Sequence, residues 1–284
     1  MITMKGDAVS AKLKEQVEKG LETLTWVPKL TIIRVGENPD DISYEKGATK
    51  KLTSFGLEVE SKVFPGDISD EAFKKEFAAI NADASVDGIL MLRPLPKQIN
   101  EQDIEKMIDP AKDLDGISPV NIAKVFSGDT SGFAPCTAEA VVCMLKMNDI
   151  ALSGKRVAVV GRSMVVGRPL SMLLLHENAT VTICHSRTAN LPEVCREADI
   201  LTACVGKAAM INHTYVKKDA VVIDVGINVD ENGKLCGDVD FADLDGTASA
   251  ATPVPGGVGG VTTAVLAQHL VRAARMKQEK NSNK

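Results

Sequence analysis

The chain has 284 residues, of which 44% are hydrophobic, 25% charged and only 4% aromatic. This length allows one large domain or two ordinary ones, and the composition excludes disordered, collagen-like and disulfide-scaffold chains. A formal net charge of −5 argues against a nucleic-acid-binding protein. One Trp, two Tyr and seven Phe also leave few aromatic rings for stacking single-stranded nucleic acid.

The N-terminal segment and the six cysteines give further expectations. The segment is charged from Lys5 onward and has no apolar core, so we expect no signal peptide. Residues 246–271 carry no charge, but their glycines and prolines are typical of a loop that leads into a helix, and no membrane span is expected. No cysteine pair has zinc-site spacing, so we expect no metal, reduced thiols and a cytoplasmic protein.

The first third of the chain alternates between helical and strand patterns, beginning with apolar residues every three or four positions over 9–24. The other elements expected there are a strand over 30–36, a helix over 40–55, a strand over 57–64, a helix over 70–82 and a strand over 87–92. A proline-punctuated stretch and a short acidic helix then lead to the loop 109–119.

From Thr137 the alternation repeats. The expected elements are a helix over 138–148, a strand over 156–161, a helix from 167, a strand over 179–184, a helix over 190–198, strands over 199–206 and 220–226, and a final helix from 261. Asn232-Gly233 predicts a tight hairpin turn. Strands separated by helices predict parallel sheets, so the fold class is α/β.

The segment RVAVVGRSMVVGRP (156–169) carries the strongest local signal for a ligand. A strand that ends at Gly161 and leads into a helix at Gly167 gathers backbone N–H groups and the positive end of a helix dipole, which suits a pyrophosphate. Ser163 stands where the dinucleotide fingerprint has its second glycine. The string alone is therefore equally compatible with a glycine-terminated strand in any α/β protein.

The end of the next strand indicates which cofactor is used. Sites for NAD place an Asp or Glu there to bind the ribose hydroxyls, whereas this chain has Ser186 and Arg187. Serine and arginine suit a 2′-phosphate, which a carboxylate would repel, and Arg162 adds a second positive charge. NADP is expected in preference to NAD. The alternative is that Arg187 is a solvated loop residue.

Ten phrases occur in order along the chain: VGENP, GILMLRPLP, DPAKDLDGISPVN, PCTAEA, GKRVAVVGRSMVVGRP, TVTICHSRT, ADILTACVG, VVIDVGIN, GDVDF and TPVPGGVGGVTT. Together they resemble the methylenetetrahydrofolate dehydrogenase/methenyltetrahydrofolate cyclohydrolase family from about residue 5 to 275. Members oxidise the methylene bridge of 5,10-methylenetetrahydrofolate to methenyl with a nicotinamide cofactor. Bifunctional members then hydrolyse methenyl to 10-formyltetrahydrofolate, so the resemblance implies a role in one-carbon metabolism and purine biosynthesis.

The resemblance implies two α/β domains flanking a cleft. Residues 1–137 plus 265–284 would form a folate-binding catalytic domain, and residues 138–264 a Rossmann-type NAD(P)-binding domain with a mainly parallel sheet. Family members are typically homodimers, so a homodimer is expected as well. The implied substrates are tetrahydrofolate derivatives.

Matching motifs also imply the residues of each site. The cofactor would lie against Gly161, Arg162, Ser163, Gly167, Ser186, Arg187 and Ile227, and the folate against Tyr44, Asp115, Pro255, Gly256, Gly257 and Val258. Of these, Asp115 would bind the pterin ring and Tyr44 would flank it. Without the family match, Asp115 would be a turn carboxylate before Gly116, and Tyr44 a half-buried packing residue.

The chain departs from the family pattern at two positions of the hydrolytic half-reaction. The family's Tyr-x-x-x-Lys places the lysine on the tyrosine's face of a helix, but here Ala48 stands four residues after Tyr44. The family's ILVQLPLP strand has a Gln where this chain has Leu92. The sequence therefore predicts an NADP-dependent dehydrogenase with weak or absent cyclohydrolase activity, and a separate cyclohydrolase in the same pathway.

Two alternatives remain from the sequence. One is a bifunctional enzyme in which Lys46, Lys50 or Arg93 has replaced the missing groups; the other is a folate- or nucleotide-binding protein without turnover. A third departure, Gly260-Val261 in place of the family's Pro-Met, has no consequence that the sequence assigns.

Overall fold

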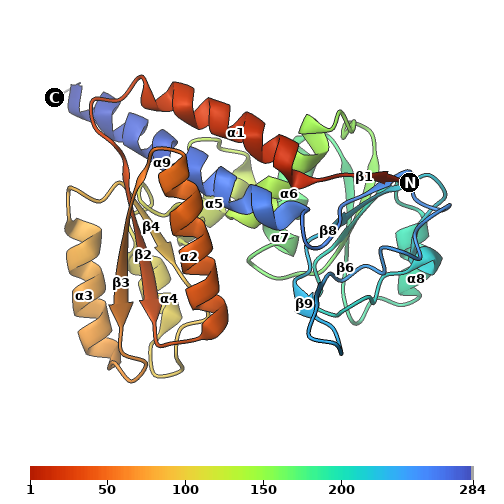
Figure 1. Cartoon of the computed structure of the whole chain (residues 1–284), viewed down its shortest axis with the longest axis horizontal. Coiled ribbons are helices and arrows are strands. Elements are labelled where there is room, and N and C mark those ends of the chain that lie inside the picture. Colours follow the sequence, from red (N-terminus) through yellow and green to blue (C-terminus); the bar gives the residue numbers. More distant parts are fainter. Residues whose placement is uncertain (283–284) are drawn as a thin grey trace. The chain divides into compact units, whose positions relative to one another are not determined.

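The computed structural model describes residues 1–282 and divides into two compact units. The first unit contains Met1–Lys12 and Pro135–Thr262, and the second contains Leu13–Ala134 and the described residues from Thr263 onward. Each unit has a parallel sheet with helices around it (Figure 1), which confirms the α/β fold class.

The sheet of the first unit has six strands, all paired in parallel, in the order β1-β11-β8-β7-β5-β6. In that order they are β1 (Ile2–Thr3), β11 (Ala250–Ala251), β8 (Val221–Asp224), β7 (Ile200–Ala203), β5 (Arg156–Val160) and β6 (Thr180–Cys184). The chain runs from β5 to β6 on one side and then returns to β7 on the other. This reversal is the topological switch point at which doubly wound sheets bind their ligands, outside the carboxyl ends of the strands.

The helices of this unit connect its strands. They are α6 (Cys136–Met147), α7 (Gly167–His176), α8 (Leu191–Arg196) and the 3₁₀ helix η1 (His213–Tyr215). Strands β9 (Asn228–Val229) and β10 (Leu235–Cys236) form an antiparallel hairpin, and Gly233 has a φ of +76°. The hairpin turn predicted at Asn232-Gly233 is therefore confirmed.

The N-terminal residues differ from the sequence-based assignment, which placed residues 1–137 in one domain. Ile2 and Thr3 pair with Ala250 and Ala251, and the backbone N–H of Met4 donates to the carbonyl of Ala251. Met1–Lys12 consequently clusters with residues 135–262, and Figure 1 shows β1 beside the strands of that unit. A two-residue strand has no periodicity of its own, so local sequence could not indicate this pairing.

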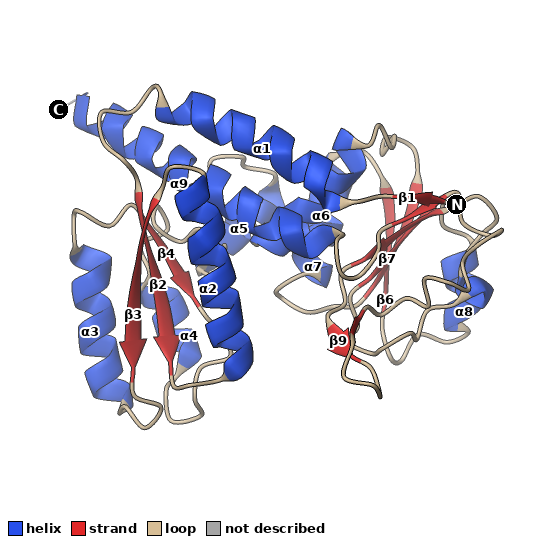
Figure 2. Cartoon of the chain, in the orientation of Figure 1, coloured by secondary structure: helices blue, strands red, loops and turns tan. Residues whose placement is uncertain are grey.

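The second unit is built on a three-stranded parallel sheet, β3-β2-β4, with helices around it (Figure 2). The elements are β2 (Lys29–Val35), α2 (Pro39–Ser54), β3 (Glu58–Phe64), α3 (Asp70–Ala82), β4 (Gly88–Met91), α4 (Glu101–Met107) and α5 (Pro119–Ser127). Helices α1 (Gly6–Leu21) and α9 (Val258–Ser282) contribute residues to both units. Within residues 1–282, no helix is both long and apolar enough to cross a membrane.

A buried carboxylate connects the sheet of the second unit to α9. Asp87, directly before β4, accepts hydrogen bonds from the indole N–H of Trp26 and the backbone N–H of Lys29, both at 3.0 Å. It also accepts from the ammonium of Lys277 on α9 at 2.6 Å. Because a buried carboxylate needs such donors to offset its desolvation, the three contacts fix the start of β2 and the end of α9 together.

We expect Asp87→Ala to lower the free energy of unfolding by about 3 kcal/mol, because it leaves the part-buried donors of Trp26, Lys29 and Lys277 without their acceptor. Urea denaturation followed by circular dichroism measures the change. The control is Glu18→Ala, whose exposed ion pair with Lys14 is worth less than about 0.5 kcal/mol. Equal effects of the two variants would contradict the structural role of Asp87.

Candidate functional site

Two glycines shape the turn between β5 and α7. Gly161 follows β5 with a φ of +140°, and a Cβ on it would lie 2.3 Å from the carbonyl oxygen of Cys204 after β7. A Cβ on Gly167, the first residue of α7, would lie 2.2 Å from the carbonyl oxygen of Gly161. Both positions therefore require glycine, as the tight turn and the close helix–strand contact of a dinucleotide site do.

The turn between these glycines is exposed and internally hydrogen-bonded. The Ser163 hydroxyl accepts from the backbone N–H of Val166 at 3.1 Å, and the Ser163 carbonyl accepts from the N–H of Arg168 at 3.1 Å. Arg162 and Ser163 are both exposed. The structure thus gathers Gly161, Arg162, Ser163 and Gly167 at the carboxyl end of β5, beside the N-terminus of α7, where an anion is favoured.

The turn after β6 presents Ser186 and Arg187 to solvent. The backbone N–H of His185 donates to the Thr188 hydroxyl at 2.9 Å, and the N–H of Arg187 donates to His185 Nδ1 at 3.1 Å. These bonds close the turn on itself and leave both predicted side chains exposed. Residues 185–190 contain no carboxylate, so the donor set fits a phosphate-bearing ribose.

Ile227 lies beyond the end of β8 and is 68% exposed, which is unusual for an isoleucine. Two buried aspartates that sequence reasoning missed, Asp224 and Asp238, lie in the same region. Asp224 accepts hydrogen bonds from the backbone N–H groups of Gly226, Asp238 and Val239, at 2.9 to 3.0 Å. Burial raises the pKa of Asp224 to about 6, against the opposing effect of these donors. The only sequence signal was a carboxylate within each of the phrases DVGIN and GDVDF.

The loop before α9 is divided between exposed and buried residues. Pro255 and Gly256 are exposed, whereas Gly257 and Val258 are buried. The carbonyl of Gly256 accepts from the backbone N–H of Gly6 at 2.9 Å, and a Cβ on Gly257 would lie 2.5 Å from the carbonyl oxygen of Pro253. Pro255 and Gly256 are thus the members of the predicted cleft loop that a ligand can reach in this unit.

The second unit carries Tyr44, which is predicted to flank the folate, and the two positions, Ala48 and Leu92, where the family pattern has a Lys and a Gln. Tyr44 on α2 is 39% exposed, and Ala48, one turn later, is 2% exposed. Lys46 and Lys50 are exposed and lie off the Tyr44–Ala48 face because they stand two and six residues from Tyr44. Leu92, the residue after β4, is 8% exposed, and its backbone N–H donates to the carbonyl of Ile33.

The loop that carries Asp115 is held by its neighbours. Buried Asp113 accepts from the backbone N–H groups of Ile117 and Ser118, at 3.0 and 2.8 Å, and from the Asn121 amide at 2.8 Å. The Leu114 carbonyl accepts from Nδ1 of buried His269 at 2.7 Å, so this nitrogen carries the proton. Asp115 itself is half-buried. Sequence reasoning missed Asp113, whose role is to shape the loop.

Arg93, an alternative hydrolytic group in the sequence, is engaged elsewhere. Its guanidinium contacts carboxylate oxygens of Glu101 and Glu105 on α4 at 3.2 and 3.3 Å. Burial raises the pKa of Glu105, while Arg93 opposes that shift. The guanidinium is therefore committed to α4.

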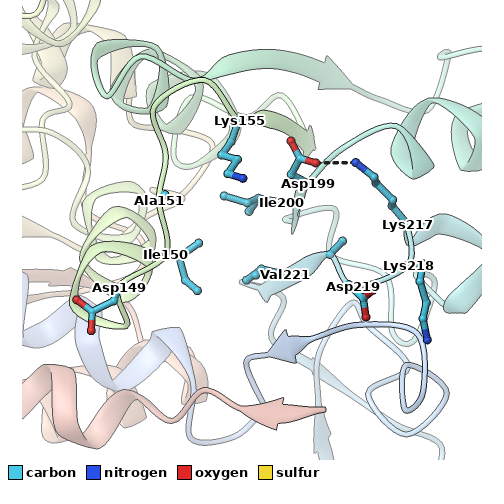
Figure 3. A pocket seen from close by; sticks show the side chains of 11 residues that line it. Asp149, Ile150, Ala151, Lys155, Asp199, Ile200, Lys217, Lys218, Asp219 and Val221 are labelled. Carbon is cyan, nitrogen blue, oxygen red and sulfur yellow. Dashed lines mark hydrogen bonds and ion pairs between the residues drawn. The ribbon is translucent and has the colours of Figure 1, made fainter.

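A cavity of about 390 Å³ lies at the other edge of the first unit's sheet, where β5, β7 and β8 begin (Figure 3). Three lysines and three aspartates line it, and Lys217 pairs with Asp199 at 2.6 Å. Because ligands of doubly wound sheets bind at the carboxyl ends of the strands, this cavity is separate from the candidate cofactor site.

No group of three or more His, Cys, Asp or Glu side chains is arranged to hold a metal ion among residues 1–282. All six cysteines are free thiols. Burial raises the pKa of Cys204, beside Gly161, to about 12, so this thiol stays protonated at neutral pH.

Comparisons with known proteins agree on one family across both units. The family model "Tetrahydrofolate dehydrogenase/cyclohydrolase, catalytic domain" matches residues 4–115, and its partner model "NAD(P)-binding domain" matches residues 135–278. The bifunctional protein FolD of Clostridium kluyveri is 51% identical over 273 residues, 96% of each chain.

Solved structures agree with this result. The bifunctional FolD dehydrogenase/cyclohydrolase of Campylobacter jejuni has a TM-score of 0.94 and 36% identity, and the match covers 98% of this chain and 99% of that one. The Trypanosoma brucei FolD, solved with NADP and an inhibitor, has a TM-score of 0.91 and 30% identity over 98% of each chain.

The raised pKa of Asp224 predicts a pH dependence of stability. Folded Asp224 keeps its proton up to about pH 6, whereas the unfolded carboxyl loses it near 3.8, so its contribution to stability falls as the pH rises between these values. The difference corresponds to about 3 kcal/mol. Urea unfolding from pH 4 to 7 should therefore show wild type losing stability relative to Asp224→Asn, which does not titrate. Parallel pH profiles would contradict the raised pKa.

Proposed function

Because the chain belongs to the tetrahydrofolate dehydrogenase/cyclohydrolase family, we propose that it oxidises 5,10-methylenetetrahydrofolate to 5,10-methenyltetrahydrofolate with NADP. A hydride leaves the methylene bridge, which becomes the cationic methenyl bridge; bound NADP⁺ supplies the acceptor. The observation that carries the proposal is the pair of glycines that bounds the turn after β5, Gly161 and Gly167, because a side chain on either would collide with backbone. Such a cradle fits a dinucleotide pyrophosphate.

Residues of this chain account for the choice of NADP. The turn Gly161–Gly167 would hold the pyrophosphate with its backbone N–H groups, with Arg162 as an adjacent positive charge. Exposed Ser186 and Arg187 would hold the 2′-phosphate, and Ile227 would lie near the nicotinamide. The Trypanosoma brucei relative was solved with NADP, which supports the same cofactor here.

The folate side needs orientation more than acid–base chemistry, because the nitrogens beside the methylene carbon already stabilise the developing cation. Asp115 would accept paired N–H donors from the pterin edge, and Tyr44 would flank the ring. The contacts of Asp113 and His269 support this proposal, since they hold the backbone on both sides of Asp115 in place. Pro255 and Gly256 would contact the folate through their exposed surfaces.

We further propose that cyclohydrolase activity is weak or absent. Hydrolysis of the methenyl bridge adds water to the cationic carbon and releases a proton, so it benefits from a group that activates the water. The position one turn after Tyr44 is Ala48, and the position after β4 is Leu92, and neither side chain ionises. Lys46 and Lys50 lie off this face of α2, and Arg93 is paired with Glu101 and Glu105.

A bifunctional enzyme is the second candidate. The specific observation in its favour is that the Clostridium kluyveri relative, 51% identical, is named a bifunctional protein. We also propose a homodimer, the assembly that the family resemblance implies. If hydrolysis is weak, a separate cyclohydrolase must consume the methenyl product.

The proposed loss of hydrolysis is tested with purified protein and methenyltetrahydrofolate, followed by absorbance. Wild type should hydrolyse it no faster than buffer, and the double variant Ala48→Lys/Leu92→Gln should accelerate hydrolysis by restoring both groups. Lys46→Ala and Lys50→Ala serve as controls and should change nothing. Clear acceleration by wild type would establish the bifunctional enzyme instead, and loss of that activity in either lysine variant would identify the substitute group.

Cofactor choice is tested by Arg187→Ala. Loss of a charged hydrogen bond to the 2′-phosphate should lower kcat/KM for NADP by roughly 10- to 100-fold and leave the value for NAD nearly unchanged. Arg196→Ala, an exposed arginine on α8, is the matched control and should keep the wild-type ratio of the two cofactors. An unchanged ratio for Arg187→Ala would show that Arg187 does not contact the cofactor.

A further inference from the structure

The phrase GDVDF contributes a carboxylate, Asp238, that no solvent reaches. One of its oxygens accepts from the backbone N–H groups of Val205 and Gly206, at 2.6 and 3.1 Å. The other accepts from the backbone N–H of Lys207 at 2.8 Å and from the Asn228 amide at 3.0 Å. Four donors thus converge on one buried charge, which is how a buried carboxylate becomes tolerable.

These donors come from two different segments. Residues 205–207 follow β7, and Asn228 is the first residue of β9, which follows β8, so both segments lie at the carboxyl edge of the sheet. β7 is also the strand that pairs with β5 at the switch point. The carboxylate of Asp238 therefore connects the loop after β7, the strand next to β5, with the segment after β8.

A second buried carboxylate, that of Asp224, holds the backbone around Asp238. Asp224 accepts from the backbone N–H groups of Gly226, Asp238 and Val239, and its own N–H donates to the Thr252 hydroxyl at 2.7 Å. A Cβ on Gly226 would lie 2.4 Å from the Asp238 carboxyl group, and a Cβ on Gly237 would lie 1.8 Å from the Asp224 carboxylate. The backbone at Gly226 and Gly237 therefore has no room to shift without breaking these contacts.

Ile227 stands between two residues of this arrangement. Gly226 packs against Asp238 and donates to Asp224, and Asn228 donates to Asp238, while the Ile227 side chain is 68% exposed. The residues on both sides of Ile227 are thus held in place, while its apolar side chain faces solvent. Of residues 226–228, only Ile227 is exposed, and the buried carboxylates of Asp224 and Asp238 hold its two neighbours.

We propose that Asp238, supported by Asp224, is a positioning residue for hydride transfer: it fixes the loops after β7 and β8 so that the nicotinamide half of the cofactor is held at its productive place. This inference rests on the proposed dehydrogenase function. Asp238 is fully buried and acts only through Ile227, Asn228 and residues 205–207. A carboxylate is needed because an amide in its place would point N–H donors at other donors.

The test compares Asp238→Asn and Asn228→Ala with wild type. A misplacement of about 1 Å costs on the order of 100-fold in rate, so kcat should fall 10- to 100-fold in Asp238→Asn and less in Asn228→Ala. The deuterium isotope effect on kcat, measured with methylenetetrahydrofolate labelled at the methylene carbon, should rise because hydride transfer becomes slow relative to the other steps of turnover.

Two further readouts do not depend on turnover. Affinity for NADP should weaken, while affinity for adenosine 2′,5′-bisphosphate, which carries only the adenosine half, should stay within twofold of wild type. Hydrogen exchange of the amides of residues 205–207 should become faster.

The control is Asp230→Asn, the same chemical change in the β9–β10 hairpin, where the carboxylate accepts from the N–H groups of Asn232 and Lys234. It should leave kcat and the isotope effect unchanged.

The proposal is overturned if both variants keep the wild-type kcat and isotope effect, or if adenosine bisphosphate affinity falls in parallel with NADP affinity, which would indicate general damage to the unit. If Asp238→Asn does not fold, Asn228→Ala decides, because it removes one donor and leaves the carboxylate in place. A wild-type protein that does not oxidise methylenetetrahydrofolate would refute the proposed function itself, before any variant is compared.

Discussion

The cofactor edge of the first unit depends on the close approach of α7 to the end of β5. Backbone meets backbone at Gly161 and Gly167, at distances that a single methyl group would prevent. This contact brings the N-terminus of α7 to the switch point between β5 and β7, and the turn after β6 lies beside it because β6 pairs with β5. The close approach places the N-terminus of α7, and the pairing of β6 with β5 places Ser186 and Arg187 beside it.

Both units hold their loops with buried aspartates that accept from backbone N–H groups. Asp113 does so for the loop with Asp115, and Asp238 for the loops after β7 and β8. A buried carboxylate is costly, so each persists only where several donors converge. That requirement makes these residues precise supports for exposed neighbours. Within one motif, Asp113 is fully buried and accepts hydrogen bonds from its own loop, and Asp115 beside it is half-buried.

The residues expected for the two half-reactions differ in where the structure places them. Every predicted cofactor residue lies at the carboxyl edge of the first unit's sheet, whereas Ala48 and Leu92 stand at the two positions where the family resemblance implies hydrolytic groups. Sequence alone indicated the helix, the i and i+4 spacing and these two side chains, because helical periodicity is local. It could not show that Arg93 is committed to Glu101 and Glu105, since that contact depends on how α4 packs beyond β4.

The sequence by itself determined the α/β class, the family, the glycine turn and the absence of a carboxylate after β6. These depend on local spacing, on residue type and on phrases that stand in fixed order. Only the tertiary structure decided that β1 pairs with β11, that Asp113 holds the loop that carries Asp115, and that Asp224 and Asp238 accept hydrogen bonds from the backbone around Ile227. Each of these arises from contacts between segments whose local sequence carries no signal of a partner. The sequence does not distinguish a buried aspartate from an exposed one, because its hydrogen-bond donors come from segments that only folding brings together.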